Sequence, residues 1–110
     1  MIEQRNYSEI AEAFKETLLE IYGENLKKVI LFGSIANGTQ TGESDMDLLV
    51  ILEHLESIEK ESERILDAAL SLENSQNIPF IISALPMAEN DYLNRETPLI
   101  LSVKREGVKI

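Results

Sequence analysis

The chain has 110 residues, which fits one domain of the commonest size, roughly 100–150 residues. Hydrophobic residues make up 44% and charged residues 27%, and the absence of cysteine excludes disulfides, thiolate metal sites and cysteine nucleophiles. Twenty acidic against ten basic residues give a formal charge of −10, so direct binding to nucleic-acid phosphates is not expected and a basic partner would suit the chain better.

The first segment of the chain is predicted to be an amphipathic helix. Asn6 and Glu9 have the spacing of a capping box, and apolar residues then recur at helical spacing until Gly23. The run from Lys27 to Phe32 is short, apolar and unbroken, as in a buried strand. Residues 33–45 are rich in glycine and small polar residues, which predicts a loop in which a short helix could open at Ser34.

The second half of the chain continues the alternation. Residues 47–52 predict a second buried strand, and a helix of about four turns then has one apolar face, formed by Ile58, Ile65, Leu66, Ala69 and Leu72. The glutamates around it are expected in water: Glu56, Glu59, Glu61 and Glu63. A third strand is predicted from Ile78 to Leu85, with Pro79 near its start. Thr97 before Pro98 predicts the start of a last helix that ends near Gly107, before a short strand over residues 108–110.

Alternating strands and helices predict an α/β or α+β fold with a mixed sheet of about three to four strands. Because the first two helices are amphipathic, we expect the helices mainly on one face, with the other left for a ligand or partner. The N-terminus has no apolar signal core, and no run approaches the ~18 apolar residues of a membrane span. We therefore expect a single cytoplasmic domain over residues 1–110.

The segment from Leu31 to Leu52 contains two signals of phosphate and metal chemistry. Gly33 and Ser34 follow a strand, where backbone N–H groups and the Ser34 hydroxyl can converge on an anion, and a Cβ at Gly33 would keep a phosphate at a distance. Asp45 and Asp47 alternate at the start of the next strand, so both carboxylates leave the same face, about 7 Å apart at Cα. Such a pair can bind Mg²⁺ together with substrate phosphates.

Two familiar sites are poor alternatives. An EF-hand would need more oxygen ligands where residues 48–52 are apolar, and the Gly-Lys-Ser/Thr ending of a Walker A loop is absent. Each signal taken alone is more often structural than functional, and an unrelated α/β domain without this chemistry is the alternative interpretation. The order of strand, Gly-Ser, ten residues, Asp-x-Asp and apolar strand is much more specific than its parts.

In that order and spacing the segment resembles the nucleotidyltransferase signature of the DNA polymerase β superfamily. With its short length and its Glu106-Gly107-Val108 close, the chain resembles a minimal nucleotidyltransferase, the small one-domain branch with a polymerase β-like palm. The resemblance implies that Gly33 and Ser34 hold a nucleoside triphosphate, and that Asp45 and Asp47 are catalytic residues that hold Mg²⁺ or Mn²⁺. Ser44, directly before Asp45, is counted with the expected nucleotide-binding residues.

The resemblance also implies a reaction and a partner. Attack on the α-phosphate of a triphosphate such as ATP releases pyrophosphate, and members of the family adenylylate, and so silence, a HEPN-domain toxin encoded beside them. A partner of that class would suit the charge of −10, and homo-oligomerisation stays open. The alternative function is a catalytically degenerate antitoxin that neutralises the HEPN-domain partner by binding alone.

The sequence departs from the family pattern in two respects. Catalytic members usually have a third carboxylate on the strand after the long helix, but here Ile81 or its neighbours stand in its place, and Glu53, Glu89 and Asp91 are not expected to substitute. Residues 29–59 contain no lysine or arginine, so magnesium would supply most of the attraction for a triphosphate, helped by Lys27, Lys28, Lys104 or Arg105 or by a basic partner. His54 and Tyr92 are interpreted as a surface residue and a packing residue.

Overall fold

The computed structural model describes residues 4–33, 45–76, 78 and 81–110. Four helices, a 3-10 turn and four strands follow one another in these ranges. They are α1 (Gln4–Tyr22), η1 (Gly23–Asn25), β1 (Leu26–Phe32), β2 (Met46–Leu52), α3 (Ile58–Gln76), β3 (Ile82–Ala88), α4 (Glu89–Asn94), α5 (Pro98–Glu106) and β4 (Val108–Lys109). In the described part of the chain, no helix combines the length and the apolar character that crossing a membrane requires.

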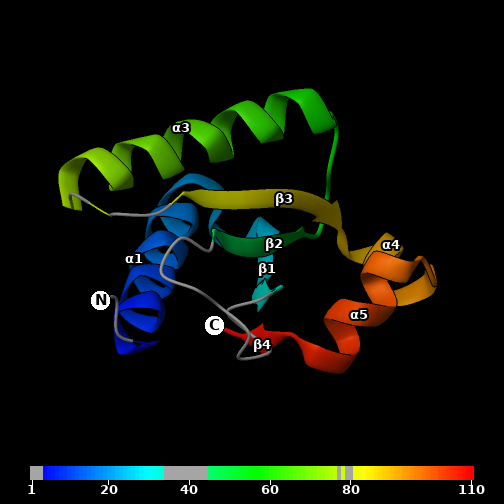
Figure 1. Cartoon of the computed structure of the whole chain (residues 1–110). Helices are drawn as coiled ribbons and strands as arrows, with labels where there is room; N and C mark the ends of the chain where they lie inside the picture. Colours follow the sequence, from blue (N-terminus) through cyan, green and yellow to red (C-terminus); the bar gives the residue numbers. More distant parts are fainter. Residues whose placement is uncertain (1–3, 34–44, 77, 79–80) are drawn as a thin grey trace.

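The strands form one mixed sheet in the order β3-β2-β1-β4. β1 is antiparallel to both β2 and β4, whereas β2 and β3 run parallel. The parallel pair is connected through α3, which runs alongside β3 in Figure 1. The predicted α/β architecture with a mixed sheet is therefore confirmed.

The two faces of the sheet carry separate hydrophobic clusters. α1 and α3 pack on one face, over a core that includes Phe14, Leu48 and Ile65. On the other face, Tyr92 of α4 and Ile100 of α5 pack on Leu49, Ile30 and Ile51. Figure 1 shows α1 and α5 on opposite sides of the strands. The long helices thus share one face as predicted, and the short α4 and α5 cover part of the second face.

The helices begin and end close to the predicted positions, with one exception. Thr97 caps α5, its Oγ1 accepting a hydrogen bond from Ile100 N–H at 3.2 Å, and Pro98 occupies the first turn. α1 ends before Gly23, which has a φ of +56°. The capping-box prediction was wrong, however, because α1 already includes Gln4 and therefore holds Asn6 inside the helix.

The buried face of α3 differs from the predicted one. It consists of Glu61, Ile65, Ala68, Ala69 and Leu72. Ile58 and Leu66 are 64% and 54% exposed, the first because it opens the helix and the second because one residue turns the side chain by about 100° away from Ile65. Glu61 is 8% exposed rather than in water, since a tyrosine hydroxyl donates to its carboxylate.

β3 begins and ends later than predicted and contains Pro86, whereas Pro79 lies outside the described residues. Ile78 N–H bonds back to the carbonyl of Glu73, so this residue continues from the end of α3. The Ile81 carbonyl accepts from Met46 N–H at 2.9 Å, which by alternation points the backbone of Pro86 away from β2. Because β3 is the edge of the sheet, the missing N–H of Pro86 removes no ladder hydrogen bond.

Candidate functional site

Asp47 lies where the first three strands of the sheet meet side by side. It is the second residue of β2, and it is paired with Phe32 of β1 and Ser83 of β3. Alternation along β2 puts its side chain on the same face as Leu49, which packs against the α4 and α5 side. Asp47 itself is only partly buried, and Asp45, just before the strand, is exposed. The carboxylates are therefore open to a ligand at the edge of the apolar cluster.

The electrostatics of the pair favour a bound cation. Burial raises the pKa of Asp47, and the neighbouring charge of Asp45 raises it further. In the described part of the chain, neither carboxylate is paired with a lysine or arginine. Two carboxylates with unmet charge are the oxygen ligands that Mg²⁺ prefers beside substrate phosphates, so these residues fit that metal.

Gly33 is in direct contact with the Asp47 carboxylate. It directly follows β1 and has a φ of +79°, and a Cβ built on it would lie 2.5 Å from Oδ2 of Asp47. The structure thus brings the end of one strand and the start of the next together at this point, as the sequence predicts. Of the other expected nucleotide-binding residues, Ser34 and Ser44 lie outside the described residues.

No third carboxylate joins the pair within the described residues, where no group of three or more metal-ligating side chains occurs. The register places Ser83 directly opposite Asp47, with Ile81 just before β3 and 59% exposed. Glu89 and Asp91 belong to α4, beyond the far end of β3. Glu53 follows the far end of β2, where its N–H bonds to the carbonyl of Asn25. The position that the sequence left without an acid is occupied by Ser83.

The nearby basic residues are held elsewhere. Lys27 forms an ion pair with Glu53 at 3.4 Å. Lys28 and Lys104 lie over the ring of Tyr92, 5.8 and 5.1 Å from its centroid. Lys28 is opposite Ile51, four residues along β2 from Asp47, which is about 13 Å of strand. Tyr92 is 8% exposed, which confirms its interpretation as a packing residue.

A comparison of the sequence with protein families shows which family the chain matches. Residues 9–103 match the model of the nucleotidyltransferase domain family. The chain belongs to this family. The match includes Gly33, Asp45 and Asp47 within one continuous range of the nucleotidyltransferase domain.

Three curated relatives from Methanocaldococcus jannaschii bear the name putative protein adenylyltransferase. One is 38% identical over 61 residues, which are 56% of this chain and 61% of the relative. Another is 37% identical over 54 residues, 49% of this chain and 37% of the relative. The aligned part therefore spans less than two thirds of the length of either relative.

Solved structures have the same fold. One is a crystal structure described as a putative nucleotidyltransferase from Sulfolobus solfataricus, with a TM-score of 0.60 at 19% identity. The matched region covers 96% of this chain and 80% of the chain in that structure. A toxin–antitoxin structure with AMP-PNP has a TM-score of 0.54 at 23% identity, covering 89% of this chain and 70% of its own. A structure of a MntA-HpeT toxin–antitoxin mutant has a TM-score of 0.52 at 22% identity, and the matched region covers 90% of this chain and 70% of that one.

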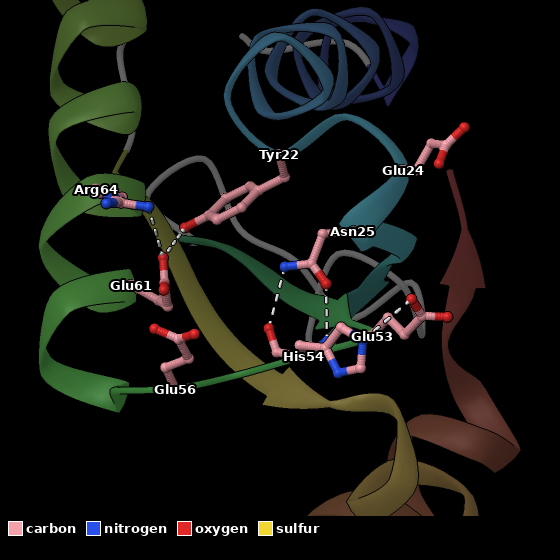
Figure 2. Close-up of a pocket in the computed structure, with 8 residues that line it drawn as sticks. All are labelled: Tyr22, Glu24, Asn25, Glu53, His54, Glu56, Glu61 and Arg64. Carbon is pink, nitrogen blue, oxygen red and sulfur yellow. Dashed lines mark hydrogen bonds and ion pairs between the residues drawn. The ribbon is translucent and has the colours of Figure 1, made fainter.

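The nucleotidyltransferase domain also has a polar hollow of about 350 Å³ at the opposite end of β2 from Asp47. Figure 2 shows Glu61 between Tyr22 and Arg64 on one side of it. The Tyr22 hydroxyl donates to Oε1 of Glu61 at 2.9 Å, and Arg64 approaches the same oxygen at 3.5 Å. Burial raises the pKa of Tyr22 above its usual range, and the hydrogen bond to Glu61 adds to the rise. These contacts connect α1 to α3.

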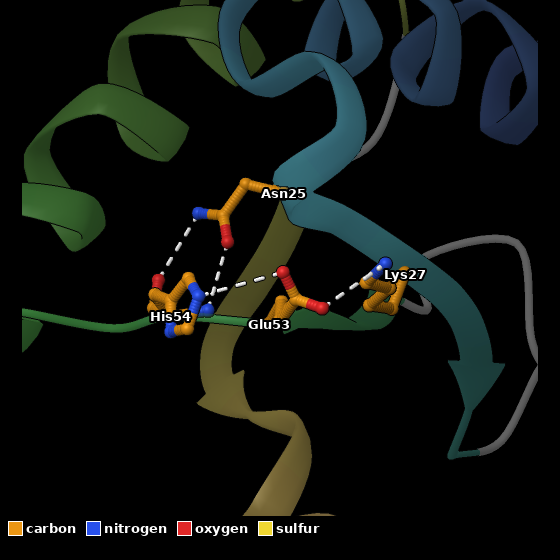
Figure 3. Close-up of polar contacts among 4 residues, drawn as sticks. All are labelled: Asn25, Lys27, Glu53 and His54. Atoms are coloured by element: carbon orange, nitrogen blue, oxygen red, sulfur yellow. Dashed lines mark hydrogen bonds and ion pairs between the residues drawn. The ribbon is translucent and has the colours of Figure 1, made fainter.

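On the second side of the hollow, side-chain contacts join the start of β1 to the end of β2. The Asn25 amide donates to the His54 carbonyl at 3.0 Å and accepts from the His54 N–H at 2.8 Å (Figure 3). Nε2 of His54 lies 3.4 Å from Oε2 of Glu53. The side chain of His54 is 81% exposed, as expected of a surface residue. Most of the polar groups around this hollow are therefore paired with one another, and these contacts tie the helices and the strand ends together.

We expect Glu61→Ala to lower the free energy of unfolding by about 1–3 kcal/mol, because the mutation leaves the partly buried Tyr22 hydroxyl without its acceptor. Chemical denaturation of the two proteins measures the difference. Glu63→Ala is the matched control, since Glu63 is exposed on the same helix and its loss should change stability by less than about 0.5 kcal/mol. Equal effects of the two substitutions would contradict a structural role for the Tyr22 contact.

Proposed function

We propose that this domain is a metal-dependent nucleotidyltransferase that transfers AMP from ATP to a hydroxyl group of a partner protein and releases pyrophosphate. The observation that supports it most is the contact between Gly33 and the Asp47 carboxylate, because it puts the glycine turn expected to receive phosphates beside the residue expected to hold a metal. The family match and the relatives that bear the name of protein adenylyltransferases agree with this reaction.

The residues have separate tasks in this proposal. Gly33 lets the phosphates approach the backbone closely, and Ser34 and Ser44 are the further predicted contacts to the triphosphate. Asp45 and Asp47 hold Mg²⁺ or Mn²⁺, which when bound neutralises phosphate charge and withdraws electrons from the phosphorus. The acceptor oxygen attacks the α-phosphorus in line, the bond to the β-phosphate oxygen breaks, and the hydroxyl proton is lost to solvent.

The acceptor is expected to approach over the open part of the sheet. Ser83 and Leu85 share the Asp47 face by alternation along β3, and Leu85 is 46% exposed. A basic HEPN-domain protein fits the charge of −10, and the toxin–antitoxin structures with the same fold support such a partner. In this proposal the protein acts in the cytoplasm as the antitoxin of a pair.

A transfer assay tests the reaction. The purified protein is incubated with a candidate HEPN-domain partner protein, Mg²⁺ and ATP labelled at the α-phosphate. The partner is then separated and its bound label is counted. We expect label on the partner and an equal amount of pyrophosphate, with neither product when EDTA removes the metal. Pyrophosphate without protein-bound label would exclude transfer to that partner, and no product at all would exclude the enzyme.

A second candidate function is neutralisation by binding alone. It is favoured by one observation: within the described residues, Ser83 and not a carboxylate faces Asp47. In that case the partner is inhibited in the complex although no label is transferred. Inhibition that needs ATP and Mg²⁺ would exclude this function.

The two candidates make different predictions for Ser83→Asp. A carboxylate at this position would join Asp47 across the β2–β3 pair, so we expect Mg²⁺ to bind about tenfold more tightly and transfer to become faster. Isothermal titration with Mg²⁺ and the labelled-ATP assay measure both changes. Ser71→Asp, on the exposed surface of α3, adds the same charge as a control. A transfer rate that stays at zero despite tighter metal binding would favour the binding-only function.

A further inference from the structure

α3 has an exposed apolar pair that the core does not use. Leu66 and Leu70 are 54% and 47% exposed, although the sequence pattern assigns Leu66 to the buried face. The two residues are four positions apart, so their side chains lie next to each other on one side of the helix. Ile65 and Leu72, by contrast, are in the core with α1 and the sheet.

Four acidic residues surround this pair at helical spacings. Glu63 and Asp67 lie three residues before Leu66 and Leu70, Glu59 lies seven before Leu66, and Glu73 lies three after Leu70. Separations of three, four and seven residues place side chains on the same side of a helix. We call these six residues the outer surface of α3. Of the two basic residues of α3, Arg64 is paired with Glu61, whereas the exposed Lys60 lies beside this surface, three positions before Glu63 and seven before Asp67. Four acidic residues against one lysine leave the surface with a net negative charge.

The outer surface of α3 lies at the free edge of the sheet. Oε2 of Glu73 is 3.4 Å from the backbone nitrogen of Ile82, the first residue of the edge strand β3. α3 packs on the sheet face that also receives α1, whereas Asp47 belongs to the opposite face. A protein bound at the outer surface of α3 would therefore leave the carboxylates accessible.

We propose that the outer surface of α3 is a docking site for a partner protein that presents apolar side chains flanked by lysine or arginine. The leucine pair supplies apolar area, and the acidic ring selects a basic rim. A second copy of this chain is a poor occupant, because it would bring four carboxylates against four and add to a charge of −10 on each molecule. The proposal goes beyond transfer chemistry: it gives the domain a contact with its partner away from the reacting atoms.

A synthetic peptide tests the chemistry of this surface without the natural partner. The probe is an amphipathic helix of ~14 residues, about four turns, made of leucine and lysine, and a peptide of the same composition in scrambled order is its control. We expect the amphipathic peptide to bind more tightly, with NMR shift changes centred on Leu66 and Leu70. Its affinity should fall as salt is raised, since the acidic ring contributes to binding.

Paired substitutions locate the binding site. Leu66→Ser with Leu70→Ser should weaken peptide binding at least about tenfold, because both leucines lose contact area. Leu93→Ser with Leu101→Ser is the matched control, since these leucines are 56% and 47% exposed but lie on α4 and α5. An equal loss in both double variants, or no preference over the scrambled peptide, would overturn the proposal.

The remaining outcomes separate this site from the catalytic one and from self-association. The variant with Asp45→Asn and Asp47→Asn should bind the peptide as the unchanged protein does, so a failed transfer assay leaves this proposal standing. Sedimentation should find no dimer that depends on Leu66 and Leu70. A dimer that the two serine substitutions dissociate would assign the surface to a second copy and overturn the proposed occupant.

Discussion

Replacing Asp45 and Asp47 together by asparagine is expected to lower the rate of AMP transfer by at least about 10³-fold, or roughly 4 kcal/mol in the activation free energy. The variant keeps the shape of both side chains but removes the two charges that would hold the metal. The labelled-ATP assay measures the rate, and titration with Mg²⁺ should show the loss of metal binding in the same protein. Retained transfer would remove both residues from the proposed mechanism.

The fold should survive this substitution. Because the pKa of Asp47 is raised, its ionised form is disfavoured in the folded protein relative to the unfolded chain, and the charge costs stability at neutral pH. The melting temperature of the variant should therefore be equal to or higher than that of the unchanged protein. A lower melting temperature would contradict this electrostatic interpretation and would leave the loss of activity open to a folding explanation.

The same variant distinguishes the two candidate functions in cells. If transfer silences the partner, the substitution abolishes protection against it although the complex still forms. If binding alone is sufficient, protection persists. Co-purification of the partner is the necessary control, because loss of the complex would remove protection under either function.

The part of the fold that holds the site could be predicted because its signals are local. β1 and β2 are apolar, unbroken and joined by a glycine-rich segment, so the chain pattern alone indicated that Gly33 and Asp47 would meet. The pairing of Phe32 with Asp47 and the contact to Gly33 place them together. The family match over residues 9–103 agrees with the resemblance inferred from this segment. The roles of Ser34 and Ser44 stay predictions, because both lie outside the described residues.

The features that could not be predicted depend on contacts between distant segments. Glu61 is charged, but it is buried because the Tyr22 hydroxyl, 39 residues away, donates a hydrogen bond to its carboxylate. The start of β3 is set by pairing with β2, since Met46 faces Ile82 and Asp47 faces Ser83. The sequence indicated that this strand has no acid, but the residue opposite Asp47 follows only from the register.

Gly33→Ala is expected to lower transfer at least about 100-fold, or roughly 2.7 kcal/mol, the second of the two largest effects. A Cβ at this position would lie 2.5 Å from Oδ2 of Asp47, so the carboxylate has to move away from its place. The φ of +79° adds backbone strain, because an alanine rarely adopts that conformation. Steady-state kinetics with ATP and Mg²⁺ measure the loss, and thermal unfolding measures the strain.

Gly23→Ala separates these two causes. Gly23 also has a positive φ, of +56°, but a Cβ there would meet nothing within 4 Å. Both substitutions should therefore lower stability by a similar amount, of order 1–2 kcal/mol, while only Gly33→Ala should lower transfer strongly. Equal losses of transfer would mean that backbone strain alone explains the effect. A selective loss at Gly33 would tie the rate to the Asp47 carboxylate, because only there does the added methyl group reach the reacting site.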